Sequence, residues 1–302
     1  MAVIDPTTFQ YSFIQEVTEG VQPLTPAMNL FSRIPGKELE YSSDMLDSQI
    51  LRTNRTRGQG RKVNRQSTGG YDLEFAYTPL TAWAISSVLG ATAVANVVTA
   101  GTTDVTATFE KKCSATEFQR HLGVRCKTFN LSAVAQEAAK CSIDLMGIKR
   151  VRGTAIIAGE TYVAEPATPL FGGADITSIL IGGVSYDIRS LELSITQDMK
   201  TRSVLGNEFA IGLNEGAFRD VSVKVEYYKN DYAADTLFEA DAPVPVSFSA
   251  LNGGKGMTFA IPSMQGAIVK DKDDGTDSIG TIELKAIRDS VSGSNIKVTF
   301  VP

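Results

Sequence analysis

Apolar and polar residues alternate strictly in several short segments of this chain, and such alternation predicts β-strands with one buried face. In ELEYSS (38–43), Leu39 and Tyr41 would face a core, while the acidic and serine side chains face the other way. The same alternation occurs in YDLEFAY (71–77), LELSIT (191–196) and VSVKVEYY (221–228). Further strands are predicted at residues 106–112, 126–134, 140–147, 245–251, 257–263, 281–287 and 296–302. The pattern is that of a mainly β protein.

Two short helices interrupt the strand pattern. The first follows residues 71–77, where Thr78 is a suitable N-cap and Pro79 suits the first helical turn. Gly90 ends this helix, and Trp83 lies on its apolar stripe, which places the indole in the core rather than at a ligand site. A second helix is predicted near residues 230–240.

The order strand, hairpin, strand, helix therefore occurs twice, at residues 38–90 and again at residues 191–240. The two segments match in pattern and order, not in identity. An internal repeat of this kind indicates a duplicated structural unit. Because neither copy carries a compact set of catalytic residues, the repeat favours a building block.

The rest of the chain is organised around these two units. Residues 1–36 contain four prolines but also several aromatic residues, which favours an N-terminal arm that packs on something, such as a neighbouring subunit. Residues 37–150 form the first predicted unit, and residues 176–302 form the second. Between them, residues 151–175 are rich in Gly, Ala and Pro and are interpreted as a linker.

The composition is that of a folded protein with a normal core, because 43% of the residues are hydrophobic and 21% are charged. A formal net charge of −5 gives no support to nucleic-acid binding by the whole surface. No apolar run approaches the roughly 20 residues of a membrane-spanning helix, and the first residues lack the pattern of a signal peptide. We therefore expect no membrane partner and a chain that stays in the compartment where it is made.

Candidate chemistry is sparse. The three cysteines match no metal-site spacing and predict free, mostly buried thiols, and the single histidine, His121, is interpreted as a surface or interface residue. Common hydrolase, phosphate-loop, zinc-protease and dinucleotide motifs are absent from the sequence. KDKDDGTDS (270–278) lacks the terminal glutamate of a calcium loop and is interpreted as a solvated turn. We expect no catalytic residues, no metal site and no cofactor.

A cluster of basic residues lies in the long loop between the first two strands. Its members are Arg52, Arg55, Arg57, Arg61, Lys62 and Arg65, with no acidic residue among them. Residues 44–70 would form a hairpin with Gly58 and Gly60 at its tip. Three interpretations are open: contact with nucleic-acid phosphates, an arm that docks on an acidic surface of another copy, and a solvated hairpin. The cluster lacks an aromatic residue for base stacking, so the docking arm is favoured.

The polar faces of the four main strands are predominantly acidic. They carry Glu38, Glu40, Asp72, Glu74, Glu192, Lys224 and Glu226. The opposite faces are apolar, so both units would present an acidic sheet face over a core. In a monomer this face would be solvated, whereas in a closed ring it would line a negatively charged channel.

These segments carry a family resemblance. They are ELEYSSDMLDSQILRTNRTRGQGRKVNRQSTGGYDLEFAYTPLTAWAISSVLG (38–90), GVRCKTFNLSAVAQEAAKCSIDLMG (123–147) and LELSITQDMKTRSVLG (191–206). In their order and repetition the chain resembles the major tail tube proteins of long-tailed, siphovirus-type bacteriophages, in a duplicated form. No single motif is diagnostic of that family.

The resemblance implies two tandem β-sandwich or half-barrel units, each with a short flanking α-helix, that form a β-barrel-lined ring when subunits assemble. Rings would stack into a hollow tube for genome passage, with residues 44–70 as the stacking hairpin and the acidic strand faces toward the lumen. Two units per chain imply homotrimeric rings with pseudo-sixfold symmetry, and hexameric rings are the alternative. The second hairpin (199–212) is shorter and less basic, so the two units would stack unequally.

The resemblance also implies partners and a location. The tape measure protein and the tail terminator and tip proteins would contact the tube, and double-stranded DNA would pass through it transiently and without sequence specificity. Assembly would take place in the host bacterial cytoplasm, and the product would be the virion tail. The alternatives are another tail-associated structural protein, such as a terminator or tube-like component, and a receptor- or carbohydrate-binding β protein. The last would need exposed aromatic residues gathered around a groove, and no loop concentrates them.

Overall fold

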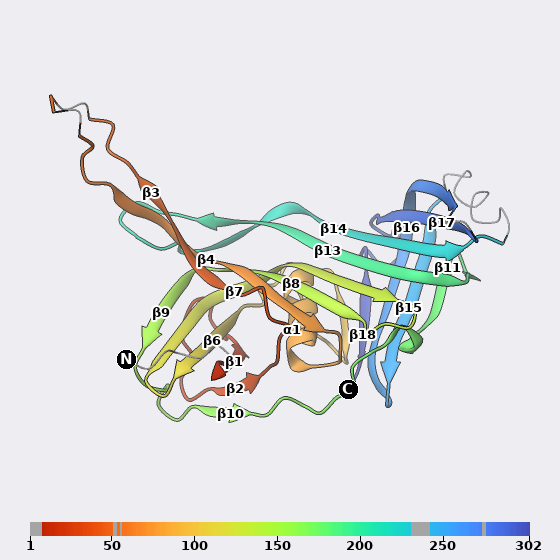
Figure 1. The fold of residues 1–302 in the computed structure, drawn as a ribbon, viewed down its shortest axis with the longest axis horizontal. Coiled ribbons are helices and arrows are strands. Elements are labelled where there is room, and N and C mark those ends of the chain that lie inside the picture. The colour runs from red at the N-terminus through yellow and green to blue at the C-terminus, as the bar shows by residue number, and fades with distance from the viewer. Residues whose placement is uncertain (1–7, 51–52, 55, 231–241, 274–275) are drawn as a thin grey trace.

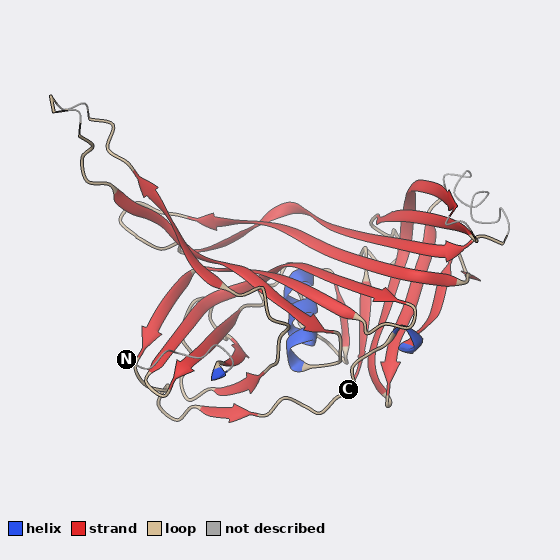
Figure 2. Ribbon diagram, viewed as in Figure 1, coloured by secondary structure: helices blue, strands red, loops and turns tan. Residues whose placement is uncertain are grey.

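The computed structural model describes residues 8–50, 53–54, 56–230, 242–273 and 276–302. Most of these residues are in β-strands, which confirms the mainly β prediction, and the described part of the chain contains one α-helix (Figure 2). A long hairpin projects well beyond the body of the molecule (Figure 1). The body consists of two groups of strands that correspond in strand order.

The first group is built from two hairpins. The strands β3 (Glu40–Leu46) and β4 (Arg61–Glu74) form the projecting hairpin, and β7 (Glu117–Val134) and β8 (Lys140–Gly147) form the next. The two hairpins join through β4 and β8, which pair from Ser67↔Gly147 to Glu74↔Lys140. The order across the sheet is therefore β3-β4-β8-β7.

The second group repeats this order. Its strands are β13 (Ile188–Arg202), β14 (Gly212–Tyr228), β16 (Lys255–Asp273) and β17 (Ser278–Ala286). The hairpin of β13 and β14 joins the hairpin of β16 and β17 through β14 and β17. The order is β13-β14-β17-β16, so each strand has a counterpart in the first group.

Further strands flank the outer halves of β7 and β16. In the first group these are β1 (Gln10–Gln15), β2 (Ala27–Leu30), β6 (Ala107–Ser114), β9 (Lys149–Gly153) and β10 (Thr161–Val163). In the second they are β11 (Ile176–Ile181), β12 (Val184–Ser185), β15 (Val244–Asn252) and β18 (Lys297–Val301), with β5 (Val97–Thr99) beside β18 and the 3-10 helix η2 (Gly173–Asp175) before β11. β6 and β9 flank β7 as β15 and β18 flank β16.

The two groups meet at a continuous antiparallel seam between β7 and β13. The seam runs from Ser190↔Val134 to Thr196↔Thr128 without a register shift. The eight strands of these two orders thus form one sheet, which stays open at both ends within the described residues. We call this the main sheet.

The helix α1 (Pro79–Leu89) packs on the apolar face of the main sheet, and its predicted caps are confirmed. The Thr78 side-chain oxygen accepts from the backbone N–H of Thr81 at 3.2 Å, and Gly90 adopts the left-handed conformation at φ 61°. Trp83 is 5% exposed and packs against Phe13 and Phe109, which confirms its predicted place in the core. The second predicted helix, near 230–240, lies almost entirely outside the described residues.

Some sequence-based interpretations change. From Gln10 onward the N-terminal arm is part of the first group, because β1 pairs with β6 and places Tyr11 and Phe13 in the core. The segment interpreted as a linker contains β10, which pairs with β2. His121 is not a surface residue, since it is 3% exposed and its Nδ1 lies 2.8 Å from the hydroxyl of Ser67.

Candidate functional site

One face of the main sheet is polar and lies opposite the helix. Strict alternation separates this face from the core, because each buried row is followed by a polar row one residue along every strand. The row of cross-strand neighbours Leu73, Cys141, Leu131, Leu193, Val223 and Leu284 is buried. Cys126 and Cys141 are buried free thiols, as predicted, and Cys113 is half-buried.

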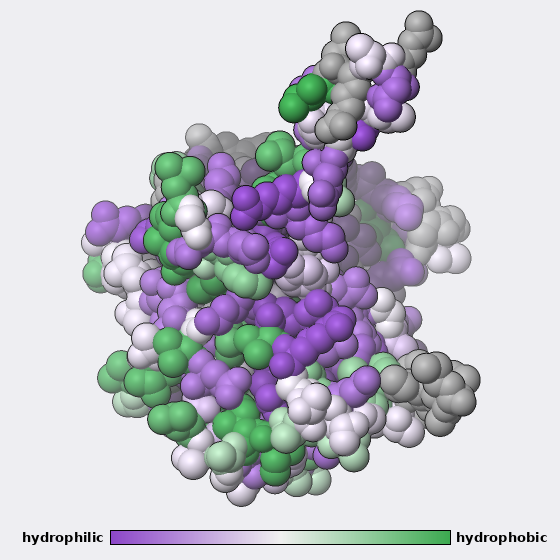
Figure 3. Space-filling model, turned by 90° about the vertical axis from the view of Figure 1, so that its left-hand side faces the viewer, coloured by the Kyte–Doolittle hydropathy of each residue, from purple (hydrophilic) through white to green (hydrophobic). Residues whose placement is uncertain are grey.

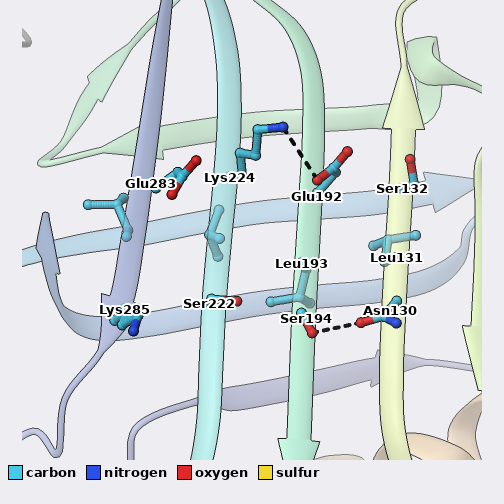
Figure 4. A pocket seen from close by; sticks show the side chains of 12 residues that line it. Asn130, Leu131, Ser132, Glu192, Leu193, Ser194, Ser222, Lys224, Glu283 and Lys285 are labelled. Atoms are coloured by element: carbon cyan, nitrogen blue, oxygen red, sulfur yellow. Dashed lines mark hydrogen bonds and ion pairs between the residues drawn. The ribbon is translucent and has the colours of Figure 1, made fainter. Parts of the chain in front are cut away.

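The next row along the sheet carries charges of alternating sign. Its members in strand order are Glu74, Lys140, Ser132, Glu192, Lys224 and Glu283. The ammonium of Lys224 lies 3.9 Å from the carboxylate of Glu192, and the Ser194 hydroxyl donates to Asn130 at 2.6 Å in the adjacent row (Figure 4). These side chains line a hollow of about 410 Å³ that spans β7, β13, β14 and β17. The polar face is therefore concave at the seam between the two groups.

The polar face is more mixed in charge than the sequence predicted. Acidic side chains still outnumber basic ones, and they are Asp72, Glu74, Asp144, Glu192, Asp220, Glu226 and Glu283, with Glu40 opposite Thr68 at the β3 edge. Lys140 and Lys285 come from β8 and β17, two of the strands whose polar positions were not part of the prediction. Lys224 lies between Glu192 and Glu283. By contrast, Lys140 has one acidic cross-strand neighbour, Glu74, and Lys285 has none.

Glu38 does not lie with these side chains. It precedes β3 and turns toward β1 and β6, where it forms ion pairs with Arg33 and, at 2.5 Å, with Lys111. The Tyr11 hydroxyl donates to it at 2.6 Å. Burial raises the pKa of the Glu38 carboxyl, but the opposing hydrogen bonds from Lys111 and Tyr11 hold that pKa below its ordinary value. Burial, followed by the bond to Glu38, raises the pKa of Tyr11 to about 12.

The projecting hairpin carries the basic cluster, and we call the described residues among 44–63 the arm. Arg52 and Arg55 lie outside the described residues. Arg61 and Lys62 are exposed, and Arg57 forms a largely exposed ion pair with Asp47 at 3.0 Å. The arm stands clear of the body when the molecule is seen from that end (Figure 3).

Arg65 has a different role from the rest of the cluster. Its guanidinium lies 2.5 Å from Glu208 and 5.7 Å from the ring centroid of Phe209, and both partners belong to the connection between β13 and β14. An isolated β-bridge joins the same Arg65 and Phe209. The second hairpin therefore braces the base of the arm, a contact that charge counting along the sequence did not reveal.

The arm also exposes apolar side chains that the sequence analysis missed. Met45, Leu46 and Ile50 are 60%, 61% and 69% exposed. These side chains lie where the hairpin has left the body, so the same chain does not bury them. Exposed apolar side chains of this kind indicate a contact surface. The arm is thus both basic and apolar.

The described residues contain no group of histidine, cysteine and carboxylate side chains that could hold a metal ion. The helix α1, with 11 residues, is too short to span a membrane, and the described part of the chain offers no other candidate helix. Serine hydroxyls of the polar face are bound to neighbouring charged side chains, as Ser190 is to Glu226 at 3.3 Å and Ser142 is to Lys37 at 3.0 Å. The contents of this face suit a solvated wall.

Comparison with protein families matches residues 10–291 to a family described as phage tail tube protein. The chain belongs to this family. No curated protein sequence matches it. Family membership makes the chain a structural component of the phage tail and not an enzyme, as the sequence predicted. For a tail tube protein, the surfaces to consider are the sheet edges, the arm and the polar face.

Proposed function

We propose that the chain is a duplicated tail tube subunit of the siphovirus type, and that three copies close into a ring with pseudo-sixfold symmetry. The seam between β7 and β13 carries this proposal. It joins two groups of the same strand order inside one chain, and it therefore serves as a template for the junction between chains.

The open edges of the main sheet are the counterparts of this seam. In the described residues β3 pairs with β4 alone, and from Gly266 on the pairings of β16 are with β17. β16 corresponds to β7, and β3 corresponds to β13. An antiparallel junction between β16 of one chain and β3 of the next repeats the internal seam and removes both edges, which would otherwise invite aggregation.

Ring closure directs the polar face toward the lumen, because the opposite face is covered by α1 and the core. An acidic majority repels DNA phosphates, and Lys224 is flanked by Glu192 and Glu283. Double-stranded DNA would slide along such a wall without being held. The arm extends along the strand direction and would reach the next ring, so that rings stack into a tube.

The remaining assignments follow from the same role. A tube of this kind contains the tape measure protein and ends at terminator and tip proteins, and its assembly takes place in the host bacterial cytoplasm. The virion tail is its location. These partners would contact surfaces that form only when several chains assemble.

Electron microscopy of the purified protein tests the proposal. We expect hollow tubes whose rings have threefold symmetry, and light scattering of the ring species should give a mass of three 32.4 kDa chains. Rings of six chains would show that the ring is a hexamer and not a trimer. A chain that stays monomeric at high concentration, even with tail initiator complexes added, would overturn the proposed function.

A further inference from the structure

A groove lies at the end of β4 that is farthest from the arm. It consists of two hollows of about 480 and 610 Å³ that share Ser32, Arg33, Pro35 and Glu165. The larger one is lined by residues before β3, after β4 and after β10. We call it the acceptor groove.

The geometry points to the acceptor groove as the docking site for the arm of another copy, an inference that rests on the proposed function. The arm adjoins the first residue of β4, Arg61, and the groove lies at its last residue, Glu74. At ~3.3 Å per residue the two ends of this strand are about 40 Å apart, so an arm cannot reach the groove of its own chain. A contact between opposite ends of identical subunits is head-to-tail and generates a filament.

The groove matches the arm in charge. Glu74 is exposed and, although Lys140 is its cross-strand neighbour, forms no ion pair among the described residues. Glu165 accepts a hydrogen bond from Ser32 at 2.7 Å and likewise forms no ion pair in the described part of the chain. Arg33 also lines the groove, and its guanidinium is turned to Glu38, a carboxylate that it shares with Lys111. The groove thus offers two carboxylates without an ion pair among the described residues, which are opposite in charge to Arg61 and Lys62 of the arm.

The groove also matches the arm in apolar surface. Its lining includes Ile34, Pro35, Pro166 and Leu170, and Leu170 is 46% exposed. The arm brings Met45, Leu46 and Ile50 as the complementary apolar side chains. Docking would bury the apolar side chains of the arm against the apolar lining of the groove, and this burial would stabilise the contact.

A charge swap tests this docking. Glu74→Lys with Glu165→Lys, and separately Arg61→Glu with Lys62→Glu, should each leave rings intact but shorten the tubes at least about tenfold, as an ion-pair loss of about 1.4 kcal/mol per contact would do. All four substitutions in one chain should restore tube length. Asp187→Lys is the matched control, because Asp187 lines the smaller hollow at the corresponding end of β14.

Cross-linking supplies an independent measurement. One protein carries Met45→Cys and the other Thr168→Cys, both in a Cys113→Ser background because Cys113 is half-buried. A disulfide-linked dimer should form in mixed tubes and in neither protein alone. The acceptor groove would be ruled out as the docking site if the groove variants form tubes of normal length, or if the Asp187→Lys variant forms no tubes. Neither result would argue against ring formation. A wild-type chain that forms no rings would remove the proposed function itself.

Discussion

The guanidinium of Arg125, in β7, forms an ion pair with the carboxylate of Glu215, in β14, and so ties the two groups of strands together beside their seam. Arg125 is fully buried, and its other terminal nitrogen lies 2.6 Å from Asp104. Glu215 in turn lies 3.6 Å from Arg219. A buried charge with defined partners is costly to leave unpaired, which makes this contact sensitive to substitution.

Glu215→Gln should therefore lower the free energy of unfolding by about 2–3 kcal/mol, less than a complete loss of partners because Asp104 remains. Urea unfolding of the unassembled protein measures this loss. Asp47→Asn is the control, since the ion pair of Asp47 with Arg57 is exposed and should contribute less than about 1 kcal/mol. Equal losses in the two variants would contradict a stabilising role for the buried pair.

His121 should make the protein less stable in mild acid. Burial, and then the nearby Arg150 and Lys111, lower its pKa to about 4, whereas an unfolded histidine has a pKa near ~6.5. Between these values the unfolded chain binds the proton more readily, so stability falls as the pH falls from about 6.5 to 4 and is unaffected above that window. The full shift corresponds to about 3 kcal/mol.

His121→Gln checks this prediction, because glutamine keeps a polar contact to Ser67 but does not titrate. The free energy of unfolding should depend less on pH in the variant than in the wild type between pH 4 and pH 6.5. Carboxylates such as Glu38 contribute equally to both proteins and cancel in the comparison. Parallel pH profiles would show that His121 is not the group responsible.

The strands of the main sheet were predictable wherever one face is buried. Alternation located β7, β8, β13 and β14 because a register slip would expose an entire apolar row. β4 begins ten residues before its predicted start, at Arg61 rather than Tyr71, because the arm-side half is solvated and needs no alternation. The short strands β2 and β10 escaped prediction since their pairing is set by partners distant in sequence.

The site was predictable residue by residue but not as a surface. Glu192 and Glu226 lie on the polar face as expected, yet its charge also depends on Lys140 and Lys285, which enter from neighbouring hairpins. Glu38 follows the alternation rule in sequence but is drawn inward by cations from other segments. Such contacts arise from tertiary packing, which local patterns do not encode.

Gly70 is required where β4 pairs with β8, opposite Asp144. A Cβ at this position would lie 2.0 Å from the carbonyl oxygen of Ile143, which belongs to the backbone and cannot rotate away. Gly70→Ala should therefore push the two strands apart and lower the free energy of unfolding by about 3 kcal/mol. Gly172→Ala is the matched control, because its Cβ would meet nothing closer than 3.7 Å. Similar midpoints of thermal unfolding for both variants would show that the sheet absorbs the methyl group.

The polar face should become adhesive to DNA when its charge is reversed. Glu192→Lys, alone or with Glu226→Lys, adds cations to a face that would be repeated through every ring, while both side chains lie outside the core and leave the fold intact. Each added lysine contributes a phosphate contact, so the binding of DNA inside tubes should tighten and its dependence on salt should steepen.

The measurement is co-sedimentation of double-stranded DNA with tubes across a salt series, together with the titre of phage that carry the variant. Glu117→Lys is the control, since Glu117 is an exposed acid at the turn between β6 and β7, away from the polar face. We expect retained DNA and a lower titre for Glu192→Lys and neither effect for Glu117→Lys. If both variants behave alike, the polar face does not line the channel, because only lumen charges meet the passing phosphates at contact distance.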